Sequence, residues 1–279
     1  MKKWTMIIDV AECTNCQNCA LATMDEYIGN DFAGYAAPMP KHGHRWIDIQ
    51  QKERGQLPMI DIAFVPTMCN HCDNAPCVAK GGDAVTKRED GIVLIDPDKA
   101  KGRKDLVDAC PYGAVWWNEE LKIPQAWPFD AHLIDSGWTQ TRGELSCPTL
   151  AMRAFCVDDN ELAKLVEEQG LEVLRPELGT KPRVYYRNLW RYTTCFIGGT
   201  VSTEIDGAIE CVEGAHVRLL KDGVWVNDAT TDAYGDFKLD QLAQESGPYT
   251  IEVEVDGKPA RSIEAPKLAE SLFLGEIRV

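Results

Sequence analysis

The sequence predicts a chain of two parts, an α+β domain rich in loops over residues 1–195 and a small all-β domain over residues 196–279. Its 279 residues exceed what one small hydrophobic core requires. The cysteines that recur at short spacings, and seven of the eight tryptophans, come before residue 195. After it, short runs of alternating apolar and polar residues are separated by glycine-containing turns, as in a small all-β domain.

Charge and hydropathy narrow the class of protein. The chain has 29 basic and 44 acidic residues, a formal net charge of −15, which is the wrong sign for binding phosphate backbones or anionic lipid. Asp9 and Glu12 interrupt any apolar run near the N-terminus, so we expect no signal peptide. No run of about 18 apolar residues occurs. We therefore expect a soluble chain that binds neither nucleic acid nor membrane.

Eight of the eleven cysteines follow a pattern that is typical of metal ligands. Two triples at short spacing are followed, much later, by two single cysteines that each precede a proline. A triple can surround three corners of a [4Fe-4S] cube, and a distant Cys-Pro can supply the fourth thiolate. The pattern therefore predicts two [4Fe-4S] clusters. The candidate ligands are Cys13, Cys16, Cys19, Cys69, Cys72, Cys77, Cys110 and Cys147.

Structural zinc is the alternative cofactor, since zinc also binds C-x2-C pairs. Zinc sites more often combine two such pairs than two triples with Cys-Pro singles, so the pattern favours iron and sulfur. His71, between two cysteines of the second triple, is a candidate ligand only for zinc; otherwise we expect it to donate to a sulfur or to solvent. The cysteines without a pattern are expected to be buried apolar thiols. These are Cys156, Cys195 and Cys211.

The first domain is expected to end in a helix and a connecting segment. Residues 158–170 predict a helix because Asp158 or Asp159 can cap its start, Gly170 can cap its end, and apolar residues share one side. Residues 171–190 are interrupted by proline and favour extended structure. We interpret the chain from about residue 157 as the segment that ties off the first domain.

Residues 196–279 have the periodicity of strands with one buried face. Tyr249 and Ile251, for example, alternate with polar residues. Asp-Gly pairs at 222–223 and 256–257 lie between such runs, where glycine allows the positive φ of a hairpin turn. We expect a small antiparallel β-sandwich of the immunoglobulin-like type.

In its cysteine groups the sequence resembles the multi-cluster, ferredoxin-like iron–sulfur (beta) subunits that partner molybdopterin oxidoreductases. Members of that family have four cysteine groups that together hold four cubes. The resemblance places the third group at residues 99–113 and the fourth around residues 127–147. It implies a ferredoxin-like first domain of a reduced multi-cluster type. The family's ligand positions that are not cysteine here are Thr23, Gly81, Ala100, Arg103, Leu106, Trp127, Asp130 and Gly143.

The replaced ligands fall into two complete sets. In the resembled family the fourth cysteine of each group crosses to the neighbouring cluster. Under this rule one deleted cluster would have used positions 23, 127, 130 and 143, and the other positions 81, 100, 103 and 106. Two clusters keep full ligand sets, which the resemblance assigns as Cys13, Cys16, Cys19 and Cys147 for cluster 1, and Cys69, Cys72, Cys77 and Cys110 for cluster 2.

Longer shared stretches, such as residues 74–81, 89–97 and 176–186, narrow the resemblance to subunits whose enzymes act on phenolic rings. It implies a non-catalytic subunit that stores or relays electrons for a large catalytic subunit holding molybdenum on two pterins. The complex would be a cytoplasmic heterodimer of anaerobic aromatic metabolism, of transhydroxylase or hydroxylase type. The chain has no P-loop, G-x-S-x-G or H-E-x-x-H, so we assign it no catalytic residue.

Two other functions stay open. The chain can be an electron-transfer subunit of another molybdopterin oxidoreductase that exchanges electrons with a soluble carrier, or a structural scaffold with redox-silent clusters. The deletion of two clusters favours the transhydroxylase interpretation. An enzyme that oxidises one phenol and reduces another has no net electrons to export, and so needs no unbroken relay.

The replaced positions and the cysteine loops also predict local structure. Trp127 with Phe129 has the volume to fill part of a deleted cluster's space, unless Trp127 is a surface-loop aromatic. Arg103 can replace another cluster with a charge that needs a partner. Asparagines in or beside the loops can donate to cluster sulfurs or serve as loop formers. These are Asn15, Asn18, Asn70 and Asn74.

Overall fold

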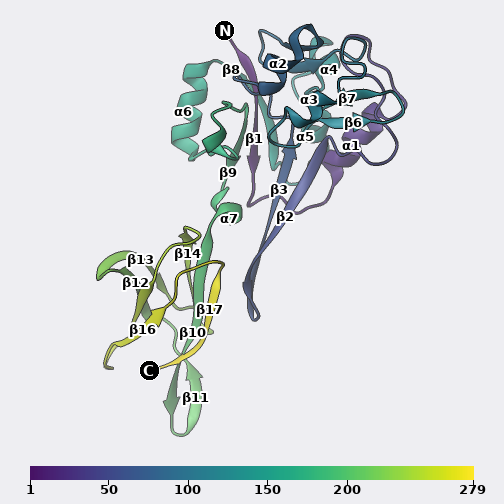
Figure 1. The fold of residues 1–279 in the computed structure, drawn as a ribbon. Coiled ribbons are helices and arrows are strands. Elements are labelled where there is room, and N and C mark those ends of the chain that lie inside the picture. The colour runs from purple at the N-terminus through teal and green to yellow at the C-terminus, as the bar shows by residue number, and fades with distance from the viewer. The chain divides into compact units, whose positions relative to one another are not determined.

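The computed structural model describes residues 1–279, which form two compact units. Unit 1 comprises Met1–Gln51 and Phe64–Leu189, and unit 2 comprises Lys52–Ala63 and Trp190–Val279. Figure 1 labels most of the helices and strands of both units.

Unit 1 contains a three-stranded sheet. Its middle strand, β1 (Lys3–Asp9), pairs antiparallel with β8 (Met152–Val157) and parallel with β9 (Val184–Arg187). β1 contains an apolar run at residues 6–8, as expected for a central strand that is covered on both faces, and Met6 and Ile8 are fully buried. The sheet thus brings the first residues of the chain next to the end of the segment that was expected to tie off the first domain.

The other elements of unit 1 are short and separated by loops, so unit 1 is α+β and loop-rich, as the sequence predicts. β4 pairs with β5 and β6 with β7 as two-stranded hairpins. The short elements are α1 (Asn18–Tyr27), α2 (Pro76–Gly81), η1 (Gly82–Ala84), β4 (Val85–Lys87), β5 (Val93–Ile95), α3 (Asp105–Asp108), β6 (Trp116–Asn118), β7 (Ile123–Gln125), α4 (Ala131–Asp135), α5 (Arg142–Ser146) and η2 (Pro176–Leu178).

The predicted helix is confirmed as α6 (Asp159–Gln169). The Asp158 side chain accepts the backbone N–H of Glu161, and the Glu161 side chain accepts the N–H of Asp158, which makes a capping box. Gly170 ends the helix with a φ of 58°. Both ends therefore lie where the capping residues in the sequence place them.

Unit 2 is largely β, with two four-stranded sheets. In one, β10 pairs antiparallel with β11 and β14 and parallel with β17; the other has the order β13-β12-β15-β16. A short helix, α7 (Trp190–Thr193), precedes them. The strands are β10 (Cys195–Ile205), β11 (Ala208–Cys211), β12 (His216–Lys221), β13 (Val224–Thr230), β14 (Asp236–Leu242), β15 (Tyr249–Glu254), β16 (Arg261–Ala265) and β17 (Leu272–Arg278).

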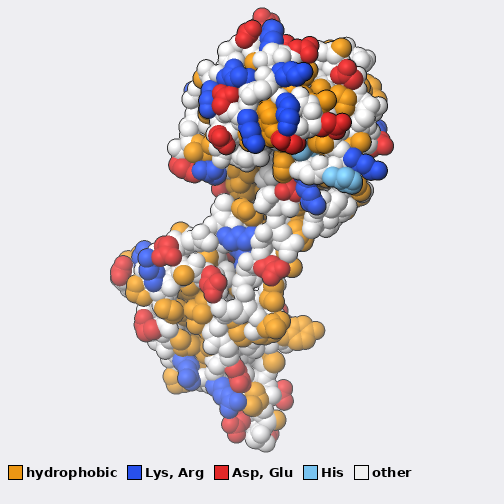
Figure 2. All heavy atoms as spheres, turned by 45° about the vertical axis from the view of Figure 1, so that its right-hand side comes forward, with side chains coloured by type: hydrophobic (Ala, Val, Ile, Leu, Met, Phe, Trp, Pro, Cys, Tyr) orange, Lys and Arg blue, Asp and Glu red, His pale blue; other side chains and the backbone are white.

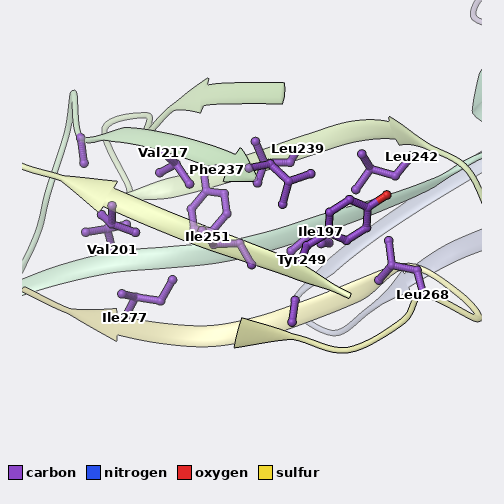
Figure 3. Close-up of a cluster of buried hydrophobic side chains, with 14 of the residues drawn as sticks. Ile197, Val201, Val217, Phe237, Leu239, Leu242, Tyr249, Ile251, Leu268 and Ile277 are labelled. Carbon is purple, nitrogen blue, oxygen red and sulfur yellow. The ribbon is translucent and has the colours of Figure 1, made fainter. Parts of the chain in front are cut away.

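Side chains from both sheets form one hydrophobic core (Figure 3). Ile197 and Leu239 from the first sheet, and Val217 and Ile251 from the second, are fully buried within it. The predicted alternation is confirmed along β15, where every second residue is buried. The pairing of β17 with β10 is parallel rather than antiparallel, because the chain passes through the second sheet before it returns to the first.

The predicted turn at 222–223 is confirmed. Asp222 and Gly223 connect β12 to β13 and have φ angles of 51° and 76°. Positive φ at both central residues is the property of the hairpin turn whose twist matches that of its strands.

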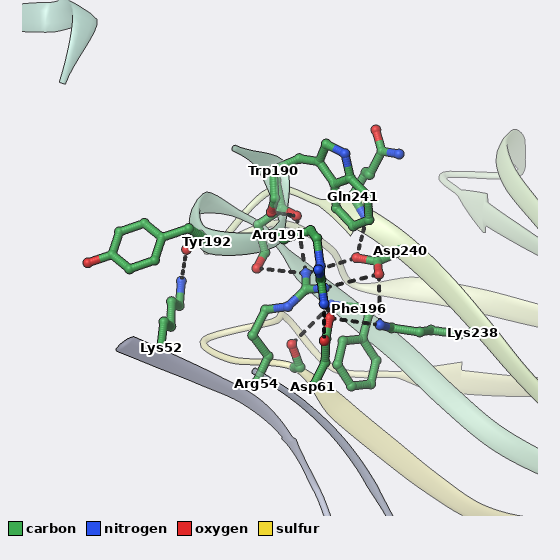
Figure 4. Close-up of polar contacts among 12 residues, drawn as sticks. Lys52, Arg54, Asp61, Trp190, Arg191, Tyr192, Phe196, Lys238, Asp240 and Gln241 are labelled. Atoms are coloured by element: carbon green, nitrogen blue, oxygen red, sulfur yellow. Dashed lines mark hydrogen bonds and ion pairs between the residues drawn. The ribbon is translucent and has the colours of Figure 1, made fainter. Parts of the chain in front are cut away.

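The far end of a hairpin from the first half of the sequence also belongs to unit 2. The hairpin consists of β2 (Ile47–Gln56) and β3 (Met59–Met68), and Lys52–Ala63 is the part within unit 2. The two units therefore differ from the expected ranges 1–195 and 196–279, because buried Arg54 forms ion pairs with Asp61 and Asp240 (Figure 4). The expected ranges stay a prediction about independently folding domains.

The surface mixes charges of both signs. On the face shown in Figure 2, Lys and Arg side chains lie among Asp and Glu side chains, so the net charge of −15 is not gathered into one patch there. None of the helices has both the length and the apolar character that crossing a membrane requires.

Candidate metal centres

The first cysteine triple and the later Cys147 meet at one pocket. Cys13, Cys16, Cys19 and Cys147 all line it, and the pocket is partly open to solvent. Cys19 is buried, whereas Cys16 is exposed. The pocket therefore has sulfur atoms on several sides and one edge near the surface.

The thiols of this pocket affect one another's charge. Burial raises the pKa of Cys19 to about 12, and negative charge on Cys13, Cys16 or Cys147 would raise it further, while the N–H of Ala20 lowers it. Burial likewise raises the pKa of Cys13, and negative charge on Cys147 or Cys16 would add to that rise. Four thiolates this close repel each other strongly, so a bound cationic group is what would make the arrangement favourable.

Backbone geometry places these cysteines. Asn15 and Gln17 have φ angles of 57° and 64°, a conformation that asparagine tolerates well and that turns the chain tightly between ligands. Ser146, next to Cys147, donates its hydroxyl to the carbonyl oxygen of Asn18 at 3.2 Å, and the Asn18 amide donates to the Ser146 carbonyl at 3.4 Å. This exchange joins the Cys147 end of α5 to the start of α1.

The second triple and Cys110 form a separate group. Cys69 and Cys72 are buried, at 9% and 7% exposure. Burial raises the pKa of Cys77 to about 11, and negative charge on Cys110 and Cys72 would raise it further. The pKa of Cys69 is raised by burial and then by negative charge on Cys77 and Cys110. The structure thus brings together the same four cysteines that the family resemblance groups as cluster 2.

Residues 70–74 are held by residues 180–183, which run beside them. Three backbone hydrogen bonds of 2.8–2.9 Å join the two segments, between Arg183 N and Asn70 O, Asp73 N and Lys181 O, and Asn74 N and Thr180 O. The segment that was expected only to tie off the domain therefore packs on the second cysteine loop.

The donor set fits iron–sulfur clusters better than zinc. All eleven cysteines are free thiols. A tetrahedral zinc site with Zn–S bonds of about 2.3 Å needs sulfurs about 3.8 Å apart, yet no three His, Cys, Asp or Glu side chains are gathered closely enough to hold a single metal ion. Two groups of four neighbouring thiols suit the corners of two cubes.

His71 is buried beside two aromatic rings. It is 1% exposed, and its Nδ1 accepts the N–H of Val93 at 3.0 Å, which leaves the proton on Nε2. Nε2 has no hydrogen-bond partner in the protein, and the ring lies edge-on to Trp127 and Phe129. Burial lowers the pKa of His71 to about 3, so the imidazole is neutral. The ring is too buried to donate to bulk solvent, and donation to a cluster sulfur stays a prediction.

The first set of replaced ligand positions lies in a packed interior. Trp127 and Phe129 are 0% and 1% exposed with ring centroids 4.8 Å apart, so Trp127 is a filling residue and not a surface aromatic. Asp130 is fully buried and accepts hydrogen bonds from the Tyr27 hydroxyl at 2.9 Å, the Trp127 indole at 3.0 Å and the Arg142 N–H at 2.8 Å. Burial raises the pKa of Asp130, and these three bonds oppose that rise.

Thr23 and Gly143, the other two positions of this set, are buried between α1 and α5. The Thr23 hydroxyl donates to the carbonyl oxygen of Cys19 at 2.9 Å. A Cβ atom on Gly143 would lie 3.4 Å from Cδ1 of Ile47 and 3.5 Å from Cβ of Cys19. Neighbouring side chains therefore pack closely around both Thr23 and Gly143.

The second set of replaced positions forms a small apolar core. Ala100 and Leu106 are fully buried and pack with Val85 and Val93. Gly81 is so close to this core that an added Cβ would lie 2.4 Å from Cγ2 of Val85. Apolar side chains therefore pack closely at these positions.

Arg103 takes no part in that core. Its Nε donates to Oδ1 of Asp105 at 2.9 Å, and both side chains are more than a third exposed. The expected partner exists, but the charge does not replace a cluster inside the protein, since the ion pair lies at the surface, where solvent hydrates the guanidinium.

The asparagines serve the loops instead of the sulfurs. Asn74 donates through its side chain to the Gly179 carbonyl at 3.2 Å, as Asn18 does to Ser146, and the Oδ1 atom of Asn70 has no partner. The side chain of Asn15 accepts a bond from Gln17. The loop-former alternative is the one that these contacts support.

One threonine hydroxyl beside a sulfur atom was not anticipated. Thr149 Oγ1 lies 3.7 Å from Cys147 Sγ. Thr149 follows Cys147 by two residues, and this short spacing could have marked it in the sequence.

The cysteines outside the two groups differ in burial. Cys195 is 2% exposed, as expected. Cys156 and Cys211 are exposed, which corrects the expectation that they are buried. Cys156 is on β8, an edge strand, and Cys211 ends β11, whose four residues are all exposed.

The chain is similar to one family of domains and to several known proteins. Residues 60–156 match the family described as a 4Fe-4S dicluster domain. The chain is 47% identical to the pyrogallol hydroxytransferase small subunit of Pelobacter acidigallici, over 92% of this chain and 93% of that one. It is 30% identical to a tetrathionate reductase subunit of Salmonella typhimurium (67% and 73% covered). It is 32% identical to the arsenate respiratory reductase iron–sulfur subunit of a Shewanella species (65% and 94% covered).

Proposed function

The chain belongs to the family of iron–sulfur subunits of molybdopterin oxidoreductases, and on that premise we propose that it is the small subunit of a molybdenum bis-pterin enzyme acting on phenolic rings. The observation that supports this most is 47% identity along nearly the whole length of a pyrogallol hydroxytransferase small subunit. The large subunit would hold the molybdenum and perform the chemistry. This chain would be non-catalytic and cytoplasmic.

We propose two [4Fe-4S] clusters, one held by Cys13, Cys16, Cys19 and Cys147 and the other by Cys69, Cys72, Cys77 and Cys110. The mutual effects on thiol pKa within each group support this assignment. The packing at the replaced positions supports a count of two, because Trp127 and Phe129 fill one deleted site and Ala100 and Leu106 the other.

A bound [4Fe-4S] cluster supplies one-electron chemistry, and its potential depends on charge, hydrogen bonds and exposure. The residues of this chain would contribute by positioning the clusters. Buried Cys69 and Cys72 would keep cluster 2 from water, whereas exposed Cys16 would leave an edge of cluster 1 near the surface. An edge of that kind is where electrons would pass to and from a partner.

The proposed clusters would store electrons during turnover and would not export them. Transhydroxylation oxidises one phenol and reduces another, so the electrons balance within the enzyme. We further infer that unit 2 is an immunoglobulin-like sandwich, which its two sheets and shared core support.

Metal and sulfide analysis of the anaerobically purified large–small complex tests the proposal. The full-length small chain, analysed alone, should contain about eight iron and eight acid-labile sulfide. The complex should contain molybdenum in addition. A chain that contains zinc, or no sulfide, would overturn the assignment of both sites.

A second function is an electron-transfer subunit that exchanges electrons with a soluble carrier. It is favoured by the similarity to tetrathionate and arsenate reductase subunits. Stopped-flow spectroscopy of the complex separates the two functions. Clusters that are reduced by a phenol and reoxidised by an external acceptor at the rate of turnover would support the carrier function. Clusters whose oxidation state follows turnover without any external acceptor would support the transhydroxylase.

A further inference from the structure

We propose that this chain binds an aromatic carboxylate with a ring hydroxyl, in a pocket between α1 and the segment of residues 41–47 that leads into β2. The site is additional to the proposed clusters and needs no particular role of theirs in turnover. Three features of the pocket define the ligand: its positive charge, an apolar wall, and two buried nitrogen atoms without partners.

Positive charge surrounds the mouth of the pocket. Lys41, His42 and Arg45 line it and are exposed. None of its lining residues is acidic, although the chain has 44 Asp and Glu residues. Arg45 uses only Nη1 for its ion pair with Asp48, at 3.2 Å, and Lys41 forms no ion pair. Unpaired cations around a cleft attract anions, so the pocket favours a negatively charged ligand.

The α1 side of the pocket is apolar. Ala20, Leu21 and Met24 from this helix line it together with Ile47, and Leu21 is 58% exposed. The pocket has a volume of about 480 Å³ and is partly open to solvent, which is within the range of small-molecule sites. A single inorganic anion would leave most of this volume and the leucine side chain uncovered. The ligand should therefore have an apolar body as well as a charge.

His44 and Trp46 form the buried part of the lining, at 7% and 1% exposure. The His44 Nε2 donates to the Trp117 carbonyl at 2.9 Å, so its proton is on Nε2. Burial lowers the pKa of His44, which keeps the ring neutral and leaves Nδ1 as an acceptor. Neither Nδ1 of His44 nor the indole Nε1 of Trp46 has a hydrogen-bond partner. The pocket thus has one buried acceptor and one buried donor that the protein does not satisfy.

A hydroxyl group suits both of these nitrogen atoms. It can donate its proton to His44 and accept the N–H of Trp46, whereas a carboxylate suits only the indole. A carboxylate on the same molecule would pair with Lys41 and Arg45 at the mouth. The aromatic ring between the two groups would cover Leu21. Because a buried polar atom without a partner costs free energy, a ligand that pairs both nitrogens gains affinity.

Calorimetric titration of the full-length, anaerobically reconstituted chain tests this assignment with three probes: 4-hydroxybenzoate, benzoate and phenol. Benzoate lacks the hydroxyl and phenol lacks the carboxylate. 4-Hydroxybenzoate should bind about tenfold more tightly than either, since each of the others loses one set of contacts. Equal affinity for the three probes, or no saturable binding of 4-hydroxybenzoate, would overturn the proposal.

A pair of charge reversals places the ligand in this pocket. Lys41→Glu should weaken the binding of 4-hydroxybenzoate about tenfold, because repulsion replaces attraction to the carboxylate. Lys101→Glu is the matched control: Lys101 is also exposed, does not line the pocket, and changes the net charge equally. Its affinity should equal that of the wild type. Equal weakening in the two variants would mean that net charge alone acts, and would overturn the site.

Trp46→Phe tests the buried end of the pocket. This change keeps an aromatic ring but removes the indole N–H, so the advantage of 4-hydroxybenzoate over benzoate should shrink while the affinity for benzoate stays the same. An unchanged advantage would overturn the role of the indole. Should this variant fail to fold, Lys41→Glu decides, because Lys41 is exposed and its replacement disturbs no packing.

The iron content separates this inference from the proposed function. A chain that retains about eight iron and does not bind 4-hydroxybenzoate would overturn the pocket ligand and leave the proposed clusters intact. A chain that binds 4-hydroxybenzoate but contains no iron or sulfide would defeat the proposed function alone.

Discussion

The guanidinium of Arg54 binds both carboxylate oxygens of Asp240, from Nη1 to Oδ1 at 2.9 Å and from Nη2 to Oδ2 at 3.1 Å (Figure 4). Arg54 also binds Asp61 and is 4% exposed. Its guanidinium lies 5.6 Å from the ring of Trp190 and 5.4 Å from that of Phe196. A buried bidentate contact of this kind fixes the relative orientation of the two side chains and also pairs their charges.

Replacement of Arg54 by leucine should destabilise unit 2. Two carboxylates, those of Asp61 and Asp240, would lose a buried partner, at a cost of about 3 kcal/mol. Arg218→Leu is the matched control, because Arg218 pairs with Glu254 at the surface and such pairs contribute less than about 1 kcal/mol. Urea unfolding followed by tryptophan fluorescence would measure both. Equal losses in the two variants would contradict the structural role of the buried pair.

The stability of unit 2 should fall in acid through Asp61. Burial alone would raise the pKa of Asp61, but hydrogen bonds from Arg54 and Arg191 and the charge of Lys238 lower it well below its usual value of 3.8. A carboxyl whose folded pKa is depressed stabilises the fold fully above the unfolded pKa, and this contribution is lost as pH falls below it.

The wild type should therefore exceed Asp61→Asn in melting temperature at about pH 6, and the difference should shrink between about pH 4 and pH 2. Thermal unfolding of both proteins at several pH values measures this difference in melting temperature. Acid destabilisation that both proteins share cancels in the difference. A difference in melting temperature that stays constant across this pH range would mean that the pKa of Asp61 is the same in the folded and unfolded states.

Features with a short sequence signal could be predicted. The caps of α6 lie within a few residues of the helix, and the buried face of β15 follows from alternation along one strand. The cysteine groups were visible for the same reason, since three of each four proposed ligands are close in sequence. Their pairing with Cys147 and Cys110 required the family resemblance.

Features that depend on distant pairing could not be predicted. Arg54 meets Asp240 across 186 positions, which no local pattern records. The Thr180 carbonyl accepts the N–H of Asn74 only because residues 180–183 run beside residues 70–74. The exposure of Cys156 follows from the edge position of β8, which depends on the order of strands in the sheet.

Removal of a single proposed ligand should remove one cluster. Cys147→Ala should lower iron and sulfide per chain by about half, with loss of the cluster 1 signal, because three thiolates remain where a cube needs four. Cys110→Ala should do the same for cluster 2. Cys156→Ala, at an exposed thiol outside both groups, should retain all the iron. Full iron in Cys147→Ala would show that this cysteine is not a ligand.

Truncation of Trp127 should show whether side-chain packing has replaced a cluster. Trp127→Ala would empty the volume beside Phe129 and remove a donor from Asp130, at a cost of about 3–5 kcal/mol. Trp127→Phe keeps most of the ring and should cost less. Trp138→Ala is the matched control, since that indole is 39% exposed and its loss should change stability by about 0.5 kcal/mol or less. For a unit of this size the first variant should melt about 10 °C lower. Trp127→Ala and Trp138→Ala could instead unfold at the same temperature with their iron content unchanged. The Trp127 ring would then not stabilise the fold. The packing of Trp127 and Phe129 would no longer support a count of two clusters.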